Sequence, residues 1–205
     1  MFKKIGLIGY GSFGREILCN INKTFDIFFY GNYNNLNLSE IEQKYNCKCY
    51  DISKFDFLKY KALITITNGD ERKDIINNLP KNTEYHTYID KNAILMDNNI
   101  NIGEGSIICA GTILTTNLKL GRFTQLNLST TIGHDTELGN FCTTAPGVNI
   151  SGNCKIGNNV YFGTNSSIKP NIKIVDNVII GLNSGVVKNI TESGIYIGTP
   201  AIKLN

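Results

Sequence analysis

Residues 132–157 read IGHDTELGNFCTTAPGVNISGNCKIG, and within this stretch an aliphatic residue recurs at every sixth position except at Thr144. The same register runs without an insertion from Met96 to Lys188. A helix repeats every 3.6 residues and a flat strand every 2, so neither explains a period of six. Hexapeptide periodicity is typical of a parallel β-helix, in which short strands stack coil upon coil around one core. The series comprises Ile102, Ile108, Leu114, Leu120, Leu126, Ile132, Leu138, Thr144, Ile150, Ile156, Phe162, Ile168, Ile174, Ile180 and Val186.

A second period of eighteen residues is superimposed on the first. The tetrapeptide that begins at Asn101 recurs in similar form at Lys119, Glu137, Lys155 and Lys173. Three hexads therefore form one turn, which predicts a prism with three flat faces. Two ordinary sheets of short strands are the alternative, and the uninterrupted hexad register disfavours them.

The corners of such a prism need residues that tolerate left-handed backbone angles, chiefly Gly, Asn and Asp. One column at eighteen-residue spacing meets this requirement at every step, and we expect it to form a corner. Coils stack at the inter-strand spacing of about 4.8 Å, so about five coils would make a rod of roughly 24 Å. The column consists of Asn117, Asp135, Asn153, Asn171 and Asn189.

The first 84 residues lack this period and alternate between strand-like and helix-like segments. This alternation predicts a small, Rossmann-like α/β domain over residues 1–84, followed by the β-helix domain over residues 85–205. We expect residues 191–205, which leave the hexad register, to cap the open end of the rod. The expected strands are 3–9, 25–30, 47–50 and 62–67, and the expected helices run from the glycine turn to about Lys23 and over 39–45, 55–60 and 70–79.

A G-x-G-x-x-G turn, formed by Gly9, Gly11 and Gly14, follows the first expected strand. The first glycine allows a tight bend, the second lets a phosphate approach the backbone, and the helix N-terminus then holds the anion. The second strand ends at Gly31-Asn32, where a dinucleotide site needs an Asp or Glu for the adenosine ribose. We therefore favour a site for another nucleotide over a redox Rossmann domain, and a turn that binds nothing is the remaining alternative.

Charge and composition exclude several classes of function. The formal net charge of +3 is spread without a basic block, so no nucleic-acid footprint is evident. Hydrophobic residues make up 41% of the chain, but no apolar run approaches the length of a membrane span. Met1 leads directly into a strand-like segment rather than a signal peptide, and the six cysteines lack the spacing of a disulfide framework. These features predict a cytoplasmic protein without a membrane partner, in which Cys142 and Cys154 are buried core thiols.

The sequence contains two histidines, His86 and His134. His134 belongs to the corner Gly133-His134-Asp135 and should point outward, because Ile132 takes the inward position. Asp135 is placed to orient the ring and to stabilise the imidazolium, as a general base requires. A plain surface histidine is the alternative, and we expect His86, at the domain junction, to be structural.

The eighteen-residue period places Gly152 one coil from His134, roughly 5 Å along the stack. The free N–H of a corner glycine is the kind of donor that an oxyanion uses. Lys188 lies three coils from His134, about 14 Å by the same spacing, which would let it reach the phosphates of a long thioester cofactor.

Residues 85–205 resemble the hexapeptide-repeat acyltransferases, whose β-helix is left-handed and normally trimeric. The glycine turn in a small N-terminal domain, combined with Gly133-His134-Asp135 in a coil, extends the resemblance to the whole chain. The chain is similar to the N-acetyltransferases of nucleotide-linked 4-amino-4,6-dideoxy sugars (bacillosamine, perosamine and viosamine types) and to the related sialic-acid O-acetyltransferases. Phe13 and Gly31-Asn32 depart from the histidine and the acidic pair that many members carry.

The resemblance implies a homotrimer that serves glycan biosynthesis without a metal. The N-terminal domain would hold the nucleotide-linked amino sugar, and acetyl-CoA would lie between adjacent β-helices with His134 as the general base. The implied catalytic residues are His134, Asp135 and Gly152. The cofactor-binding residues would be Thr143, Gly152, Thr164, Gly181, Leu182 and Lys188. The substrate-binding residues would be Gly9, Gly11, Ser12, Phe13, Gly14, Gly31, Asn32 and Asn68.

Three other functions are alternatives to amino-sugar N-acetylation. O-acetylation of a sugar hydroxyl uses the same machinery, and the sequence hardly separates an amine from a hydroxyl acceptor. A β-helix metalloenzyme of the carbonic-anhydrase type needs three histidines around zinc, which two distant histidines do not supply. A scaffold without catalytic activity would leave the glycine turn unexplained.

Overall fold

The computed structural model describes residues 3–21 and 24–204. Its contacts divide the chain into two compact units, Met1–Thr87 and Tyr88–Asn205. The backbone N–H of His86 donates to the carbonyl of Ala62 at 2.8 Å, and Tyr85 forms a parallel bridge with Ala62. These contacts join residues 85 and 86 to the first unit, so the division follows Thr87 rather than residue 84.

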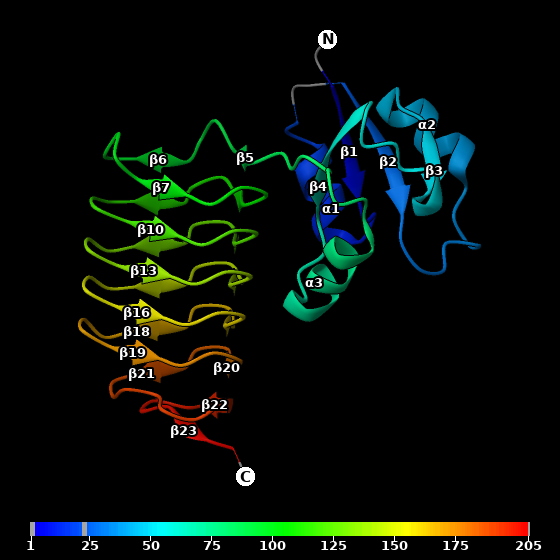
Figure 1. The fold of residues 1–205 in the computed structure, drawn as a ribbon. Coiled ribbons are helices and arrows are strands. Elements are labelled where there is room, and N and C mark those ends of the chain that lie inside the picture. The colour runs from blue at the N-terminus through cyan, green and yellow to red at the C-terminus, as the bar shows by residue number, and fades with distance from the viewer. Residues whose placement is uncertain (1–2, 22–23, 205) are drawn as a thin grey trace. The chain divides into compact units, whose positions relative to one another are not determined.

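The described residues of the first unit form a parallel sheet of order β3-β2-β1-β4 with helices α1 to α3 (Figure 1). The order of the chain reverses between β1 and β4, and open α/β sheets bind ligands at the carboxyl ends of strands at such a switch point. The elements are β1 (Lys4–Ile8), α1 (Ser12–Leu18), β2 (Phe25–Phe29), α2 (Leu38–Tyr45), β3 (Cys49–Asp51), the 3₁₀ turn Ile52–Lys54, β4 (Tyr60–Ile64) and α3 (Gly69–Asn78).

One expected helix, over residues 55–60, is wrong. The Asp56 carboxylate accepts a hydrogen bond from the Leu58 N–H at 3.0 Å and forms a turn instead. Because β4 already begins at Tyr60, too few residues remain for a helix. Helix α1 ends at Leu18, and the expected helix end near Lys23 lies outside the described residues.

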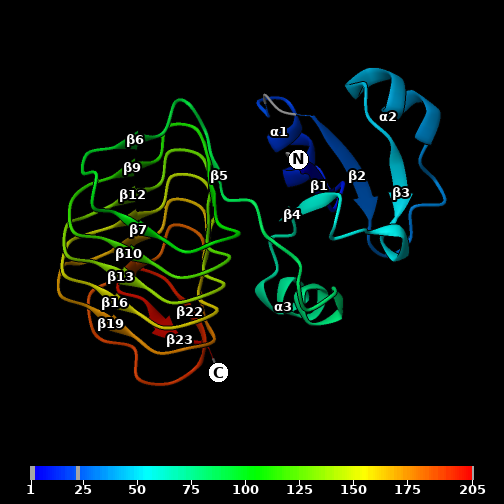
Figure 2. The same ribbon diagram turned by 45° about the horizontal axis from the view of Figure 1, so that its top comes forward.

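The second unit is a parallel β-helix whose coils are stacked in Figures 1 and 2. Residues eighteen apart pair across successive coils, as Ile132 pairs with Ile150. The three faces have the orders β19-β16-β13-β10-β7, β21-β18-β15-β12-β9-β6 and β23-β22-β20-β17-β14-β11-β8-β5. The strands are β5 (Tyr88–Ile89), β6 (Ile94–Leu95), β7 (Asn101–Ile102), β8 (Ile107–Ile108), β9 (Ile113–Leu114), β10 (Lys119–Leu120), β11 (Gln125–Leu126), β12 (Thr131–Ile132), β13 (Glu137–Leu138), β14 (Thr143–Thr144), β15 (Asn149–Ile150), β16 (Lys155–Ile156), β17 (Tyr161–Phe162), β18 (Ser167–Ile168), β19 (Lys173–Ile174), β20 (Val178–Ile180), β21 (Gly185–Val186), β22 (Gly194–Ile197) and β23 (Ile202–Lys203).

The hexad residues face inward and form the core of the rod. All of them are buried except Ile102, which packs against that core. Full burial of each aliphatic side chain stabilises the fold by about 1.5–3 kcal/mol. Cys142 and Cys154 are also fully buried, as expected for core thiols.

The predicted corner column adopts the left-handed conformation. Asn117, Asp135, Asn153 and Asn171 have φ of 54°, 58°, 58° and 64°. Asn189, which ends the column, is not among the described residues with positive φ, and its side chain accepts a hydrogen bond from the Lys173 N–H at 2.9 Å.

The C-terminal segment extends one face of the rod. Strand β22 pairs in parallel with β20, and β23 returns antiparallel to β22. Both lie at the C-terminal end of the coil stack (Figure 1), and Tyr196 packs against the core, so the expected cap is present. Within residues 3–21 and 24–204, the structure contains no helix with both the length and the apolar character that a membrane span requires.

Candidate active site

His134 lies on the corner that connects β12 to β13. Ile132 is fully buried, whereas the side chain of His134 is 59% exposed and points away from the core. Asp135 follows with φ of 58°, and its N–H donates to the carbonyl of Thr116 on the preceding coil at 3.1 Å. The corner therefore presents both side chains on the surface from a backbone that is anchored to its neighbours.

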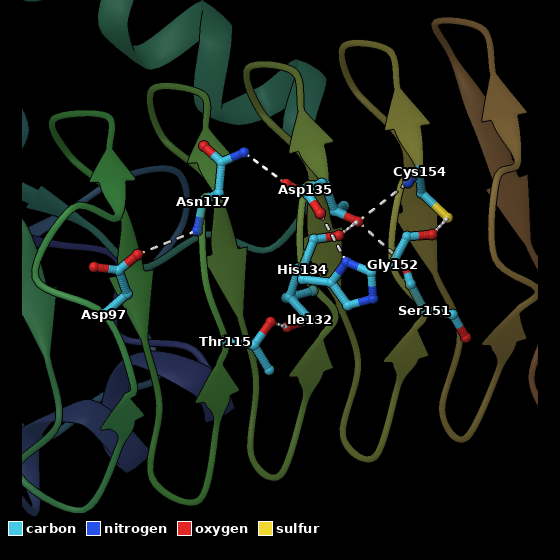
Figure 3. A network of polar contacts seen from close by, with 10 residues as sticks. Asp97, Thr115, Asn117, Ile132, His134, Asp135, Ser151, Gly152 and Cys154 are labelled. Carbon is cyan, nitrogen blue, oxygen red and sulfur yellow. Dashed lines mark hydrogen bonds and ion pairs between the residues drawn. The ribbon is translucent and has the colours of Figure 1, made fainter.

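Asp135 forms hydrogen bonds through both carboxylate oxygens (Figure 3). Its Oδ2 lies 2.8 Å from Nδ1 of His134, and its Oδ1 accepts from Nδ2 of Asn117 at 2.6 Å. The hydrogen bond from Asn117, followed by that from His134, lowers the pKa of Asp135. An ionised Asp135 can only accept a hydrogen bond, so Nδ1–H of His134 donates it and the neutral imidazole keeps its free lone pair on Nε2. His134 is thus arranged to accept a proton at Nε2.

The ring of His134 lies against the backbone of Gly152 on the next coil, as Figure 3 shows. A Cβ added to Gly152 would come within 2.7 Å of both Cε1 and Nε2 of the ring. The carbonyl of His134 accepts from the N–H of Asn153 at 2.8 Å, which ties the two corners together. Sequence spacing predicted this neighbour, and only glycine leaves room for the ring in this orientation.

Apart from Thr143, which lies in strand β14, the expected cofactor-binding residues occupy two different corners of the rod. Lys188 is exposed on the corner column of His134 and Gly152. Thr164 and Leu182 lie on the corner that follows β17 and β20, where the N–H of Asn183 donates to the Thr164 carbonyl at 2.8 Å. Leu182 is 70% exposed. The fold of one chain therefore does not gather all of these residues at one corner.

Two further members of the expected cofactor set are tied into the β-helix framework. A Cβ on Gly181 would come within 2.7 Å of the Ile197 side chain, so this glycine allows β22 to pack closely. Thr143 is 4% exposed. Neither residue therefore exposes much surface to which a cofactor could bind in a single chain.

The three glycines of the N-terminal turn have different structural roles. Gly9 has φ of 104°, which a side chain would strain. A Cβ on Gly14 would lie 2.4 Å from the carbonyl oxygen of Gly9 and 2.9 Å from Oγ1 of Thr65, so Gly14 permits close packing of α1 on the sheet. Gly11 has φ of −69°, and its Cβ would meet nothing within 4 Å. The protein itself therefore does not require glycine at position 11.

The other expected substrate-binding residues are spread over the carboxyl edge of the same sheet. Ser12, Gly31 and Asn32 are exposed, whereas Phe13 is only 8% exposed and belongs to the core. Asn68 is the N-cap of α3, and its Oδ1 accepts from the Glu71 N–H at 3.0 Å. The clearest structural role of Asn68 is therefore helix capping.

Two polar residues on the coils before His134, Asn117 and Asp97, are not among the site residues that the sequence predicts. The sequence predicts only a corner role for Asn117, although it lies eighteen residues before Asp135 and therefore directly beside it in the stack. Asp97 Oδ2 lies 3.4 Å from the Asn117 N–H. The eighteen-residue period was the signal that could have identified Asn117.

A family model described as the hexapeptide repeat of succinyl-transferase matches residues 91–116 and 129–164. A search of curated proteins finds no match. Among solved structures, WeeI from Acinetobacter baumannii is 24% identical and has a TM-score of 0.86, over 99% of this chain and 100% of that chain. The chain shares its fold. The likeness confirms a left-handed parallel β-helix that follows an α/β unit.

Two similar structures were solved with bound cofactor. The acetyltransferase domain of PglB from Neisseria gonorrhoeae, in complex with acetyl coenzyme A, is 21% identical with a TM-score of 0.83, over 98% of this chain and 99% of that chain. PerB from Caulobacter crescentus, in complex with CoA and GDP-perosamine, is 19% identical with a TM-score of 0.85, over 100% of this chain and 99% of that chain. Within the described residues, no group of three or more His, Cys, Asp or Glu side chains is placed to hold a metal ion.

Proposed function

We propose that this protein transfers the acetyl group of acetyl-CoA to the amino group of a nucleotide-linked 4-amino-4,6-dideoxy sugar. The observation that carries the proposal is the His134–Asp135 pair, which leaves Nε2 free beside the Gly152 backbone. Structures of similar fold include a complex with acetyl coenzyme A and one with CoA and GDP-perosamine.

In the proposed reaction the neutral sugar amine attacks the thioester carbonyl. Nε2 of His134 accepts the proton that nitrogen loses, and Asp135 stabilises the resulting imidazolium. The Gly152 N–H donates to the tetrahedral oxyanion. The CoA thiolate then leaves and takes a proton from the same ring. No acyl-enzyme is required, and Cys142, which is fully buried, is not exposed to a thioester.

The assembly that we propose is a cytoplasmic homotrimer. The expected cofactor residues lie on two different corners of one rod, with Lys188 on one and Leu182 on the other. A neighbouring rod would bring the second corner opposite the first, so that acetyl-CoA lies between two chains. The nucleotide-linked sugar would bind at the carboxyl edge of the parallel sheet, beside the glycine turn.

A direct test offers acetyl-CoA and a panel of UDP-, dTDP- and GDP-linked amino sugars and measures the release of free CoA. His134→Asn should lower kcat by about 10²–10⁴-fold with little change in KM. An alkali-stable amide product supports N-acetylation, whereas an alkali-labile ester would instead indicate the sialic-acid type of O-acetylation. If the asparagine variant keeps near-wild-type turnover, His134 is not the general base.

A further inference from the structure

We propose that Asn117 is a positioning residue that holds Asp135, and through it His134, in the orientation that leaves Nε2 free. This inference rests on the proposed function and assigns a role to a residue outside the catalytic pair. Its basis is a chain of polar contacts that crosses coils from Asp97 to Asn117 and from Asn117 to Asp135, and ends within one corner at His134 (Figure 3).

The contact between Asn117 and Asp135 has a defined direction. Nδ2 of Asn117 lies 2.6 Å from Oδ1 of Asp135. The opposite amide orientation would place Oδ1 of Asn117 against the carboxylate, which offers no proton, so the amide must donate. Hydrogen bonds to charged groups are shorter and stronger than neutral ones.

Asn117 is itself held in place by its backbone. Its φ is 54°, a conformation that asparagine tolerates better than most residues. Its N–H lies 3.4 Å from Oδ2 of Asp97, and the Asp97 Oδ1 accepts from the Asn99 N–H at 2.9 Å. The amide therefore extends from an anchored corner, which makes it suited to fixing a neighbouring carboxylate.

The carboxylate needs this support because its side chain is 46% exposed and would otherwise be free to rotate. Within the described residues, the side-chain partners of Asp135 are Asn117 and His134. Loss of the Asn117 amide would leave Oδ1 to water and lower the population in which Oδ2 faces Nδ1. The imidazole would then carry its proton on Nε2 in part of the molecules, and this form has no lone pair at the atom that must accept the proton.

The test uses two variants that separate donation from packing. Asn117→Gly tolerates the positive φ but lacks the amide, and Asn117→Asp keeps the size but cannot donate when ionised. Asn171→Gly is the matched control, because Asn171 has a similar φ of 64° on the same column, two coils beyond Asp135. The ring nitrogen chemical shifts of His134 report the tautomer directly, and the sequence has one other histidine to distinguish.

Both Asn117 variants should shift His134 toward the Nε2–H tautomer and lower kcat about tenfold, with KM unchanged, whereas Asn171→Gly should match the wild type. An unchanged tautomer in folded Asn117→Gly would overturn the inference. If the tautomer shifts while the wild type itself acetylates no amino sugar, the positioning role stands and the proposed function fails. The two failures are therefore distinguishable.

Discussion

At Gly11 no contact within the described residues requires glycine, so in the proposed function the phosphate of the nucleotide would be the reason for it. A Cβ there would meet nothing within 4 Å, and its φ of −69° suits any residue. Gly11→Val should therefore fold normally yet raise the KM for the nucleotide-linked sugar at least tenfold, because the side chain would block a phosphate that approaches the backbone. The KM for acetyl-CoA should stay unchanged. Equal losses of both affinities in steady-state assays would show that the turn does not bind the nucleotide.

At position 152 the His134 side chain is the reason that glycine is required. A Cβ would lie 2.7 Å from Nε2 and Cε1 of His134, and the ring is the part that can move. Gly152→Ala should therefore displace the imidazole and lower kcat by about tenfold or more, while the melting temperature changes by only a few degrees. Ser151→Ala, one residue earlier on the same corner, is the matched control. A fully active alanine variant would mean that this ring orientation is not the catalytic one.

Glu84 predicts a pH dependence of stability. Hydrogen bonds from Lys3 and Lys61 lower the pKa of its carboxyl to about 2. Because the pKa is lower in the folded state, the ionised Glu84 contributes fully to the free energy of unfolding above its unfolded pKa of about 4.3. This contribution is lost as the pH falls toward about 2. Glu84→Gln should therefore melt slightly below the wild type at pH 6, and the difference should vanish near pH 2.

The control for this experiment is Glu16→Gln. Glu16 is exposed, and within the described residues its side chain makes no hydrogen bond or ion pair. Its substitution should give a difference in melting temperature that stays constant over the same pH range. A gap between wild type and Glu84→Gln that persists to pH 2 would contradict the assignment of the ion pairs.

At the scale of the elements, residue type predicted the corner column of Asn117 but not the corner that contains Phe123 and Phe141. Asn and Asp marked the column of Asn117 and Asp135, and these residues do adopt positive φ. Phe123 and Phe141 adopt φ of 57° and 62° on another corner, although bulky residues rarely do so. Their rings stack with centroids 5.4 Å apart. This compensation comes from the next coil, so no local propensity could have predicted it.

Thr144 shows how a polar residue can occupy an apolar position in β14. It is 1% exposed, its Oγ1 accepts from the Asn127 N–H at 3.0 Å, and it pairs with the Thr130 hydroxyl at 2.8 Å. Thr144→Val keeps the shape but leaves both partners unsatisfied, so it should lower the free energy of unfolding by about 1–3 kcal/mol. Urea denaturation measures this difference. Ile150→Val, a conservative change at the next hexad position, should lower the free energy of unfolding by less than Thr144→Val does. An equal or larger loss would mean that the hydrogen bonds of Thr144 contribute little.

Across the whole molecule, the sequence predicted the fold better than the site. The hexad register specified the coils because each inward position must be apolar, and the eighteen-residue period brought His134 next to Gly152. The same period places Asn117 one coil before Asp135, but the hydrogen bond between them could not be predicted because it depends on the side-chain rotamers. Nor could it reveal that Asn68 caps a helix. These features depend on the contacts of individual atoms, which periodicity does not encode.

The last prediction concerns the assembly of the whole chain. Tyr161, Ile179 and Ile195 are adjacent in register on one face of the rod and are 39%, 43% and 41% exposed. Apolar side chains aligned in this way favour burial against another copy. In the proposed homotrimer this face would be buried against a neighbouring chain. Light scattering should then give about three times the chain mass of 22.7 kDa. Ile179→Glu should lower both that mass and the acetyltransferase activity, whereas Ser167→Glu, on a different face, should change neither. A wild-type mass of one chain at assay concentration would refute the trimer, and a trimeric Ile179→Glu would place the interface on another face.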